Sequence, residues 1–203
     1  MEVYIYEGKK EDTLLEEALK KLNFNEEDVI FRKELIKGKL FKSDSYKLSI
    51  VKNTDISDFV KEYLLNLLKT MGIETTFEVK IREKQINIKM YSNNNPILIG
   101  KNGQTLTALT TICKQAVFNQ IGMYPYLNLD VENYKDKQIM HLERLAKNIA
   151  REVRETKKDV IMDNMNAYER RIVHNCLSEF QDISTESEGD EPNRHIVVKI
   201  KKD

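Results

Sequence analysis

Residues 96–109, PILIGKNGQTLTAL, place two of the chain's seven glycines three positions apart, with Lys101 and Asn102 between them. The apolar run before Gly100 begins a short helix, and apolar residues recur with helical spacing after Gly103. Glycine adopts backbone conformations that other residues avoid. The pattern therefore predicts a tight turn between two helices, with bare main chain and helix N-terminal amides facing solvent.

Such a turn is a candidate seat for a nucleotide backbone, because a phosphate can lie against helix amides and Lys101 adds a positive charge. Ile97, Leu98 and Ile99 offer an apolar wall for bases. Alone, Gly-x-x-Gly is a weak signal that often marks only a turn between helices. It is not a P-loop, because the G-x-x-x-x-G-K-[ST] spacing is missing.

The first fifty residues alternate in a way that predicts strand, helix, strand, strand, with Asp12 as the helix cap. A basic loop, residues 37–45, joins the two later strands. About fifty residues are marginal for a stable core, so we expect this βαββ unit to pack against a neighbouring part of the chain or a partner. The polar stretch 52–57 is the predicted boundary after it.

From residue 55 the predicted order is helix, strand, strand, short helix, Gly-x-x-Gly turn, helix and strand, with Asp55 or Ser57 capping the first helix and Gly72 ending it. In this context residues 99–106, IGKNGQTL, resemble the KH domain, whose equivalent loop clamps the backbone of about four nucleotides. The element order is similar to the bacterial type II form. Relatives often have a second basic residue or histidine where Asn102 stands, so a weaker pull on phosphate is implied.

A long helix is predicted from about Lys135, after a short tether at residues 133–137. Basic residues repeat at helical spacing along one stripe of it: Arg144, Lys147, Arg151, Arg154 and Lys158. Two interpretations stay open. The stripe is either a solvated face whose cations pair with Glu143, Glu152 and Glu155, or a track for phosphates.

A second helix follows, and its spacing predicts burial of Tyr168 with five apolar neighbours further along. Arg170 and His174 lie four residues apart on one face. With the downstream segments SEGDEPNR and HIVVKI, this pattern resembles the single-strand-binding domain named for its Arg-x-x-x-His signature, R-3-H. The resemblance implies that Arg170 grips phosphate and His174 contacts phosphate or base, or braces Arg170; alternatively His174 is architectural and bonds a carbonyl in the turn. Arg194 is a further candidate contact, or only neutralises the acidic turn.

The whole chain resembles the bacterial Jag family, also called the SpoIIIJ-associated, KhpB or EloR family. The resemblance implies an α+β protein of three small domains: an N-terminal βαββ unit (1–52), a type II KH domain (55–134) and a C-terminal R-3-H domain (135–203). It also implies a single-stranded RNA-binding regulator linked to cell elongation, envelope synthesis and division. Implied partners are a small KH protein, or a second copy, through KH–KH contacts. Thr54 stands where many relatives have a longer linker, sometimes with a regulatory threonine.

A rival hypothesis is a scaffold that uses the KH fold for dimerisation and docks a membrane-associated protein through the N-terminal unit. The sequence shows no nucleophile paired with a base, no convergent carboxylate pair and no nucleotide-binding loop. We therefore expect neither an enzyme nor a small-molecule substrate. The cysteines and three histidines have no metal-ligand spacing, so no metal or cofactor is expected. The net charge is zero, which restricts any electrostatic site to a local patch. The N-terminus lacks a signal-peptide pattern, which predicts a cytoplasmic protein.

Overall fold

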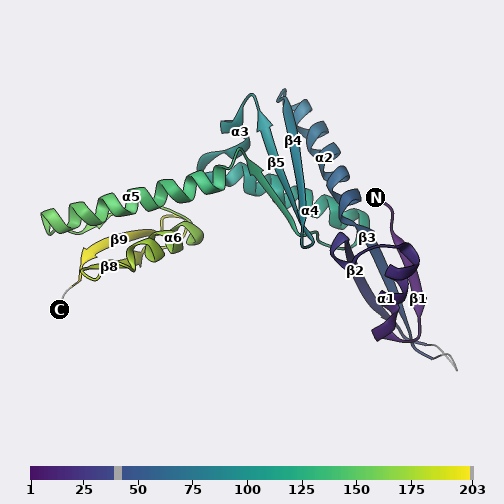
Figure 1. The fold of residues 1–203 in the computed structure, drawn as a ribbon. Helices are drawn as coiled ribbons and strands as arrows, with labels where there is room; N and C mark the ends of the chain where they lie inside the picture. The colour runs from purple at the N-terminus through teal and green to yellow at the C-terminus, as the bar shows by residue number, and fades with distance from the viewer. Residues whose placement is uncertain (39–42, 202–203) are drawn as a thin grey trace. The chain divides into compact units, whose positions relative to one another are not determined.

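The structure is a computed structural model that describes residues 1–38 and 43–201 (Figure 1). The contacts divide the chain into two compact units, Met1–Glu132 and Asn133–Asp203. The middle of the predicted basic loop, residues 39–42, lies outside the described residues. The division into three domains stays our interpretation.

The first unit begins with the predicted βαββ arrangement. It consists of β1 (Tyr4–Gly8), α1 (Glu11–Leu22), a short 3-10 turn (Glu26–Asp28), β2 (Val29–Ile36) and β3 (Ser45–Lys52). The strands form an antiparallel sheet in the order β1-β3-β2. Leu14, Ala18 and Leu19 of α1 are buried with Val29, Leu48 and Ile50 of the sheet. Apolar residues at helical spacing therefore meet alternating apolar residues of the strands.

The predicted helix caps are wrong, because both helices begin earlier. Asp12 lies inside the first turn of α1, which has Lys10 at its N-cap and no side-chain cap. Helix α2 (Asn53–Thr70) starts directly after β3, so the expected boundary stretch is helical from its second residue onward. Asp55 and Ser57 therefore lie within its first turns. The predicted end of α2 is confirmed: Gly72 has φ 73° and its amide donates to the carbonyl of Lys69 at 3.0 Å.

The βαββ part leans on the rest of its unit, as expected for so small a core. The Arg32 guanidinium donates to the carbonyl of Gly122 at 3.2 Å, and the Asn53 amide donates to the carbonyl of Glu27 at 3.0 Å. Lys84 forms an ion pair with Glu26 at 2.8 Å. These contacts link residues far apart in sequence within the first unit.

A second sheet forms from β4 (Thr75–Arg82), β5 (Gln85–Ser92) and β6 (Leu127–Val131), in that order. Strand β5 pairs antiparallel with β4 and parallel with β6. The parallel pairing needs a crossover, which is made by α3 (Asn95–Ile99), the turn Lys101–Gly103 and α4 (Gln104–Ile121). Helices α2 and α4 contact each other and pack on this sheet. The predicted order of elements is confirmed.

The second unit contains α5 (Tyr134–Thr156), β7 (Val160–Ile161), α6 (Ala167–Leu177), β8 (Ile183–Glu188) and β9 (His195–Ile200). Its antiparallel sheet has the order β7-β9-β8. Both helices contribute to one core with the sheet, which includes Ala146, Ala150, Val153, Val173, Leu177, Ile196 and Val198. The predicted tether at residues 133–137 is wrong, because α5 begins at Tyr134. Only Glu132 and Asn133, both with positive φ, separate it from β6.

Candidate nucleic-acid interface

The predicted tight turn between two helices is confirmed. Helix α3 ends at Gly100, residues 101–103 form one 3-10 turn, and α4 starts at Gln104. Gly100 has φ 70° and ψ −179°, and Gly103 has φ 74°. The amide of Gly100 donates to the carbonyl of Pro96 at 2.8 Å, which closes the end of α3. These dihedral angles lie where residues other than glycine are strained.

The chain itself explains the need for glycine at position 100. A Cβ added there would lie 2.1 Å from Oγ1 and 3.0 Å from the backbone nitrogen of Thr105. Gly103 is buried. The predicted exposure of bare main chain is therefore wrong at Gly103. The close approach at Gly100 is made by the first turn of α4, and the surface that faces solvent is provided by Lys101 and Asn102.

Lys101 and Asn102 are both exposed. Within residues 1–38 and 43–201, neither side chain has a hydrogen bond or an ion pair. Asn102 adopts a left-handed conformation (φ 51°, ψ 32°), which asparagine tolerates better than most residues. The turn thus presents a cation and an amide beside the start of an 18-residue helix whose first turn contains no acidic residue. Positive charge and helix amides at one place favour an anion.

Short helix α3 supplies the predicted apolar wall only in part. Ile97 is 47% exposed, whereas its neighbour Leu98 is 1% exposed and belongs to the core. Ile99 is half-buried. One large apolar side chain therefore lies open at the surface within four residues of Lys101.

The signature arginine of the second unit is buried and bound within its own domain. Arg170 is 8% exposed, and its Nη1 donates to the carbonyl of Met165 and to Oε1 of Glu191, both at 2.8 Å. These bonds tie α6 to the segment before it and to the turn between β8 and β9. The predicted contact of Arg170 with phosphate stays a prediction, and in this structure the guanidinium is occupied by protein groups.

His174 bridges α6 to β8, because its Nδ1 lies 2.6 Å from Oγ1 of Thr185. The predicted bond to a carbonyl in the turn is wrong; the partner is a hydroxyl on a strand. Burial, and to a lesser degree the charge of Arg170, lowers the pKa of His174 below its usual value. A neutral imidazole is therefore favoured at neutral pH.

The other predicted cations of this unit differ in their surroundings. Arg154 forms a bidentate ion pair with Asp182 and lies 4.8 Å from the ring centre of Phe180. This hydrogen bonding holds the pKa of the Asp182 carboxyl below its usual value. Arg194 donates from Nε to the hydroxyl of Ser187 at 3.0 Å. Arg151 is exposed, and in the described ranges it has no ion pair.

The predicted pairing of the basic stripe with glutamates of its own helix is wrong for the described residues. The only cation of that stripe with an ion pair there is Arg154, and its partner comes from the loop before β8. None of the stripe's cations pairs with Glu143, Glu152 or Glu155 in this part of the chain. Arg144, Lys147 and Arg151 remain exposed along α5, and Lys158 is exposed after the helix ends at Thr156.

Tyr168 contradicts its predicted burial, because it is 63% exposed. Arg171 lies three residues further along α6 and is also exposed. The sequence held a signal that could have shown this: the positions three and seven residues after Tyr168 are Arg171 and Asn175, which marks a polar face.

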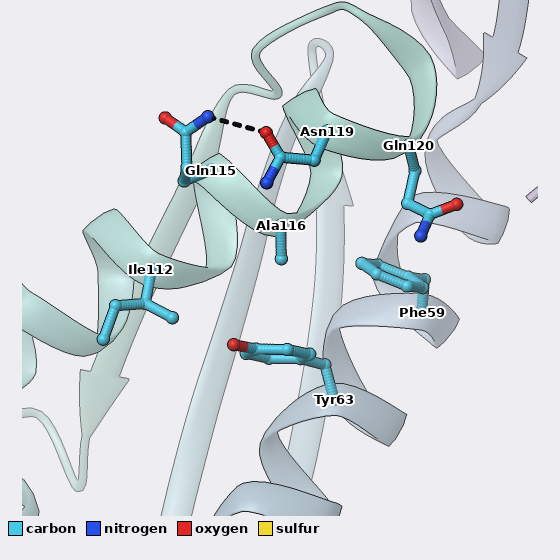
Figure 2. A pocket seen from close by; sticks show the side chains of 7 residues that line it. All are labelled: Phe59, Tyr63, Ile112, Gln115, Ala116, Asn119 and Gln120. Atoms are coloured by element: carbon cyan, nitrogen blue, oxygen red, sulfur yellow. Dashed lines mark hydrogen bonds between the residues drawn. The ribbon is translucent and has the colours of Figure 1, made fainter.

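An uncharged hollow of about 460 Å³ lies between α2 and α4 (Figure 2). Phe59 and Tyr63 stack with ring centres 6.2 Å apart and face Ala116. The remaining lining residues are Ile112, Gln115, Asn119 and Gln120. Ile112 is 44% exposed. The absence of charge in this lining suits a protein surface better than a nucleic acid.

The described part of the chain offers neither a metal centre nor a membrane-spanning helix. No group of three or more His, Cys, Asp or Glu side chains there is placed to hold a metal ion. Burial raises the pKa of the Cys113 thiol to about 12, so it stays protonated. None of the helices described is both long and apolar enough to cross a bilayer.

Two family models match the chain, one in each unit. The model described as the KH domain of KhpA/KhpB matches residues 57–125, and the R-3-H domain model matches residues 140–199. The first match contains most of α2, the turn and α4. The second contains most of α5, together with Arg170 and His174.

Curated relatives were found in several bacteria, each named RNA-binding protein KhpB. The relative from Clostridium symbiosum is 38% identical over 133 residues, 66% of this chain and 60% of the relative. The one from Lactiplantibacillus plantarum is 32% identical over 141 residues, which is 70% of this chain and 44% of the relative. The one from Bacillus subtilis is 32% identical over 157 residues, which is 76% of each protein. The matched region thus spans less than two thirds of the first two relatives.

Proposed function

The chain belongs to the KhpB family, and from that premise we propose that it binds single-stranded RNA through the turn between Gly100 and Gly103 and through its R-3-H domain. The relatives carry RNA binding in their names. In this proposal the protein is a cytoplasmic regulator that acts after transcription. The links to cell elongation, envelope synthesis and division follow from the family resemblance.

The observation that carries the proposal is the pair of exposed side chains between the two glycines. Lys101 and Asn102 are not engaged by the rest of the described chain, and the adjoining helix start carries no competing carboxylate. A phosphate seated there would accept from backbone amides and from the ammonium group. Ile97 provides an apolar surface for the adjacent base.

Each RNA site is small, so we expect modest affinity from each one and a gain when one strand occupies both. The net charge of the chain is zero. The affinity should therefore fall only gently with salt, by about 0.7 logarithmic units per phosphate contact for a single strand.

The test replaces Lys101 and Asn102 together by aspartate, which keeps both glycines and the turn. Negative charge against phosphate should weaken binding of a fluorescent single-stranded RNA by at least about tenfold and reduce the salt slope by about 0.7. Anisotropy titrations at several salt concentrations measure both quantities. Thermal unfolding should be unchanged, because both side chains are exposed.

A matched control carries the same change of charge elsewhere in the first unit. Asn66→Asp with Lys69→Asp alters two exposed residues of α2. This variant should bind RNA within about twofold of the parent protein, since distant surface charges are screened. An equal loss of RNA affinity in both variants would show that only the net charge of the protein matters. The turn would then have no specific role in binding.

The hollow between α2 and α4 favours a second candidate function, a scaffold that pairs through its KH domain with a small KH protein or a second copy. An uncharged lining with two stacked aromatic rings, Ile112 and three amide side chains fits a protein interface. The scaffold predicts a complex that survives nuclease treatment and is lost in Ile112→Asp. A chain that is monomeric, binds RNA and recovers no KH protein after nuclease treatment would rule this function out.

A further inference from the structure

The outer face of α6 carries three exposed side chains of different chemistry. Tyr168 is 63% exposed, and Arg171 and Asn175 are also classed as exposed. In the part of the chain that the structure describes, no hydrogen bond or ion pair involves any of these three side chains. An aromatic ring, a cation and an amide are thus available together on one helix.

The helix places the three groups in a row. Arg171 and Asn175 follow Tyr168 by three and seven residues, so all three lie on one side of α6. At a rise of about 1.5 Å per residue they extend over about 10 Å along the axis. This length accommodates a base, its phosphate and a neighbouring nucleotide.

Arg171 differs from its neighbour Arg170 in having no carboxylate partner. The positions three and four residues before and after it are Ala167, Tyr168, His174 and Asn175, none of which is acidic. Arg170 is neutralised by Glu191. On α6, the charge of Arg171 is therefore exposed to solvent, where it can attract a phosphate.

We propose that this face of α6 is a nucleotide-binding surface, on which one base of single-stranded RNA stacks on Tyr168, its phosphate pairs with Arg171 and Asn175 reads an adjacent base edge. Arg170 and His174 then act as positioning residues, because their bonds to Glu191, Met165 and Thr185 fix the helix. The inference rests on the proposed RNA binding and names the residues that perform it in the second unit. Stacking on an aromatic ring suits single strands, because every base has an accessible face there.

The chain contains no tryptophan, so Tyr168→Trp introduces a single indole reporter at the proposed stacking site. Its fluorescence should be quenched when a mixed-sequence, twelve-nucleotide single-stranded RNA is added, with the same midpoint as an anisotropy titration. Tyr126→Trp is the matched control, because Tyr126 is 61% exposed and lies in the first unit. Its fluorescence should change little.

Substitutions separate stacking from charge. Tyr168→Ala should weaken binding about tenfold, while Tyr168→Phe should stay within about twofold because the ring face remains. Arg171→Ala should weaken binding by a similar factor and lower the salt slope by about 0.7. Arg82→Ala, at an exposed arginine of β4, is the control for loss of one positive charge.

The outcomes distinguish this inference from the proposed function. If the parent protein binds no RNA, the proposed function fails. If it binds RNA but the introduced indole is not quenched and Tyr168→Ala binds like the parent, the α6 surface is overturned and the function stands. Quenching by a copurifying protein after nuclease treatment, with none by RNA, would also overturn it.

Discussion

The two family motifs of this chain use their polar residues in opposite ways. In the first unit, Lys101 and Asn102 are exposed, and their side chains have no partner in the described chain. The flanking glycines adopt the positive φ angles that the turn requires. In the second unit, Arg170 and His174 are bound to protein groups of their own domain. A motif residue can thus mark a binding surface either by contacting the ligand or by fixing the element that does.

The difference follows from where each motif lies. The turn 100–103 projects between two helix ends, where solvent reaches its side chains. Arg170 and His174 lie on the side of α6 that faces β8 and the following turn, so their polar atoms must find partners inside the domain. Three substitution experiments test this contrast.

The largest effect is expected from Gly100→Ala. The new methyl group would collide with Thr105, and the positive φ adds strain, so the free energy of unfolding should fall by about 3 kcal/mol. Gly72→Ala is the control, because its φ is also positive but nothing lies within 4 Å of the added Cβ. Gly72→Ala should lower the free energy of unfolding by about 1 kcal/mol. Urea titrations measure both, and equal losses would contradict a role for the contact with Thr105.

A smaller effect is expected from Arg170→Ala, which removes two hydrogen bonds and leaves the carbonyl of Met165 without its partner. The free energy of unfolding of the second unit should fall by about 2–3 kcal/mol. Arg154→Ala removes a more exposed ion pair, so the free energy of unfolding should fall by less than in Arg170→Ala. If Arg170→Ala left stability unchanged but abolished RNA binding, the contrast between the two motifs would disappear.

The smallest effect concerns pH. The pKa of His174 is lowered in the folded state, so the unfolded chain binds a proton more readily. The contribution of the neutral imidazole is fully present above about pH 6.5, the unperturbed value, and is lost as the pH falls through the lower folded value. Unfolding midpoints of the parent should therefore decrease more between about pH 7.5 and 5 than those of His174→Gln. Parallel decreases in the two proteins would show that His174 does not contribute.

The pattern of apolar residues was sufficient for much of the fold. Alternation in residues 75–91 predicted two strands, and helical spacing after Gly103 predicted α4, because burial of one face requires those periods. The glycine pair likewise predicted a tight turn, since few other residues adopt its dihedral angles. Helix starts were missed, because Lys10 and Lys52 precede α1 and α2 without any side-chain cap to mark them.

The partners of individual polar groups were decided by tertiary structure. Asp182 comes to Arg154 from 28 positions away, and Glu191 comes to Arg170 from 21. Tyr168 is exposed because Val173 and Leu177, on the opposite side of α6, pack in the core. The spacing of Arg171 and Asn175 marks the polar face in the sequence, but the bonds of Arg170 and His174 to distant segments come only from the fold. Which helices and strands form, and where the tight turn lies, could be predicted from the amino-acid sequence, because both depend on the short-range spacing of apolar residues and glycines. Only the folded chain decided which charges are neutralised, because that depends on which distant segments meet.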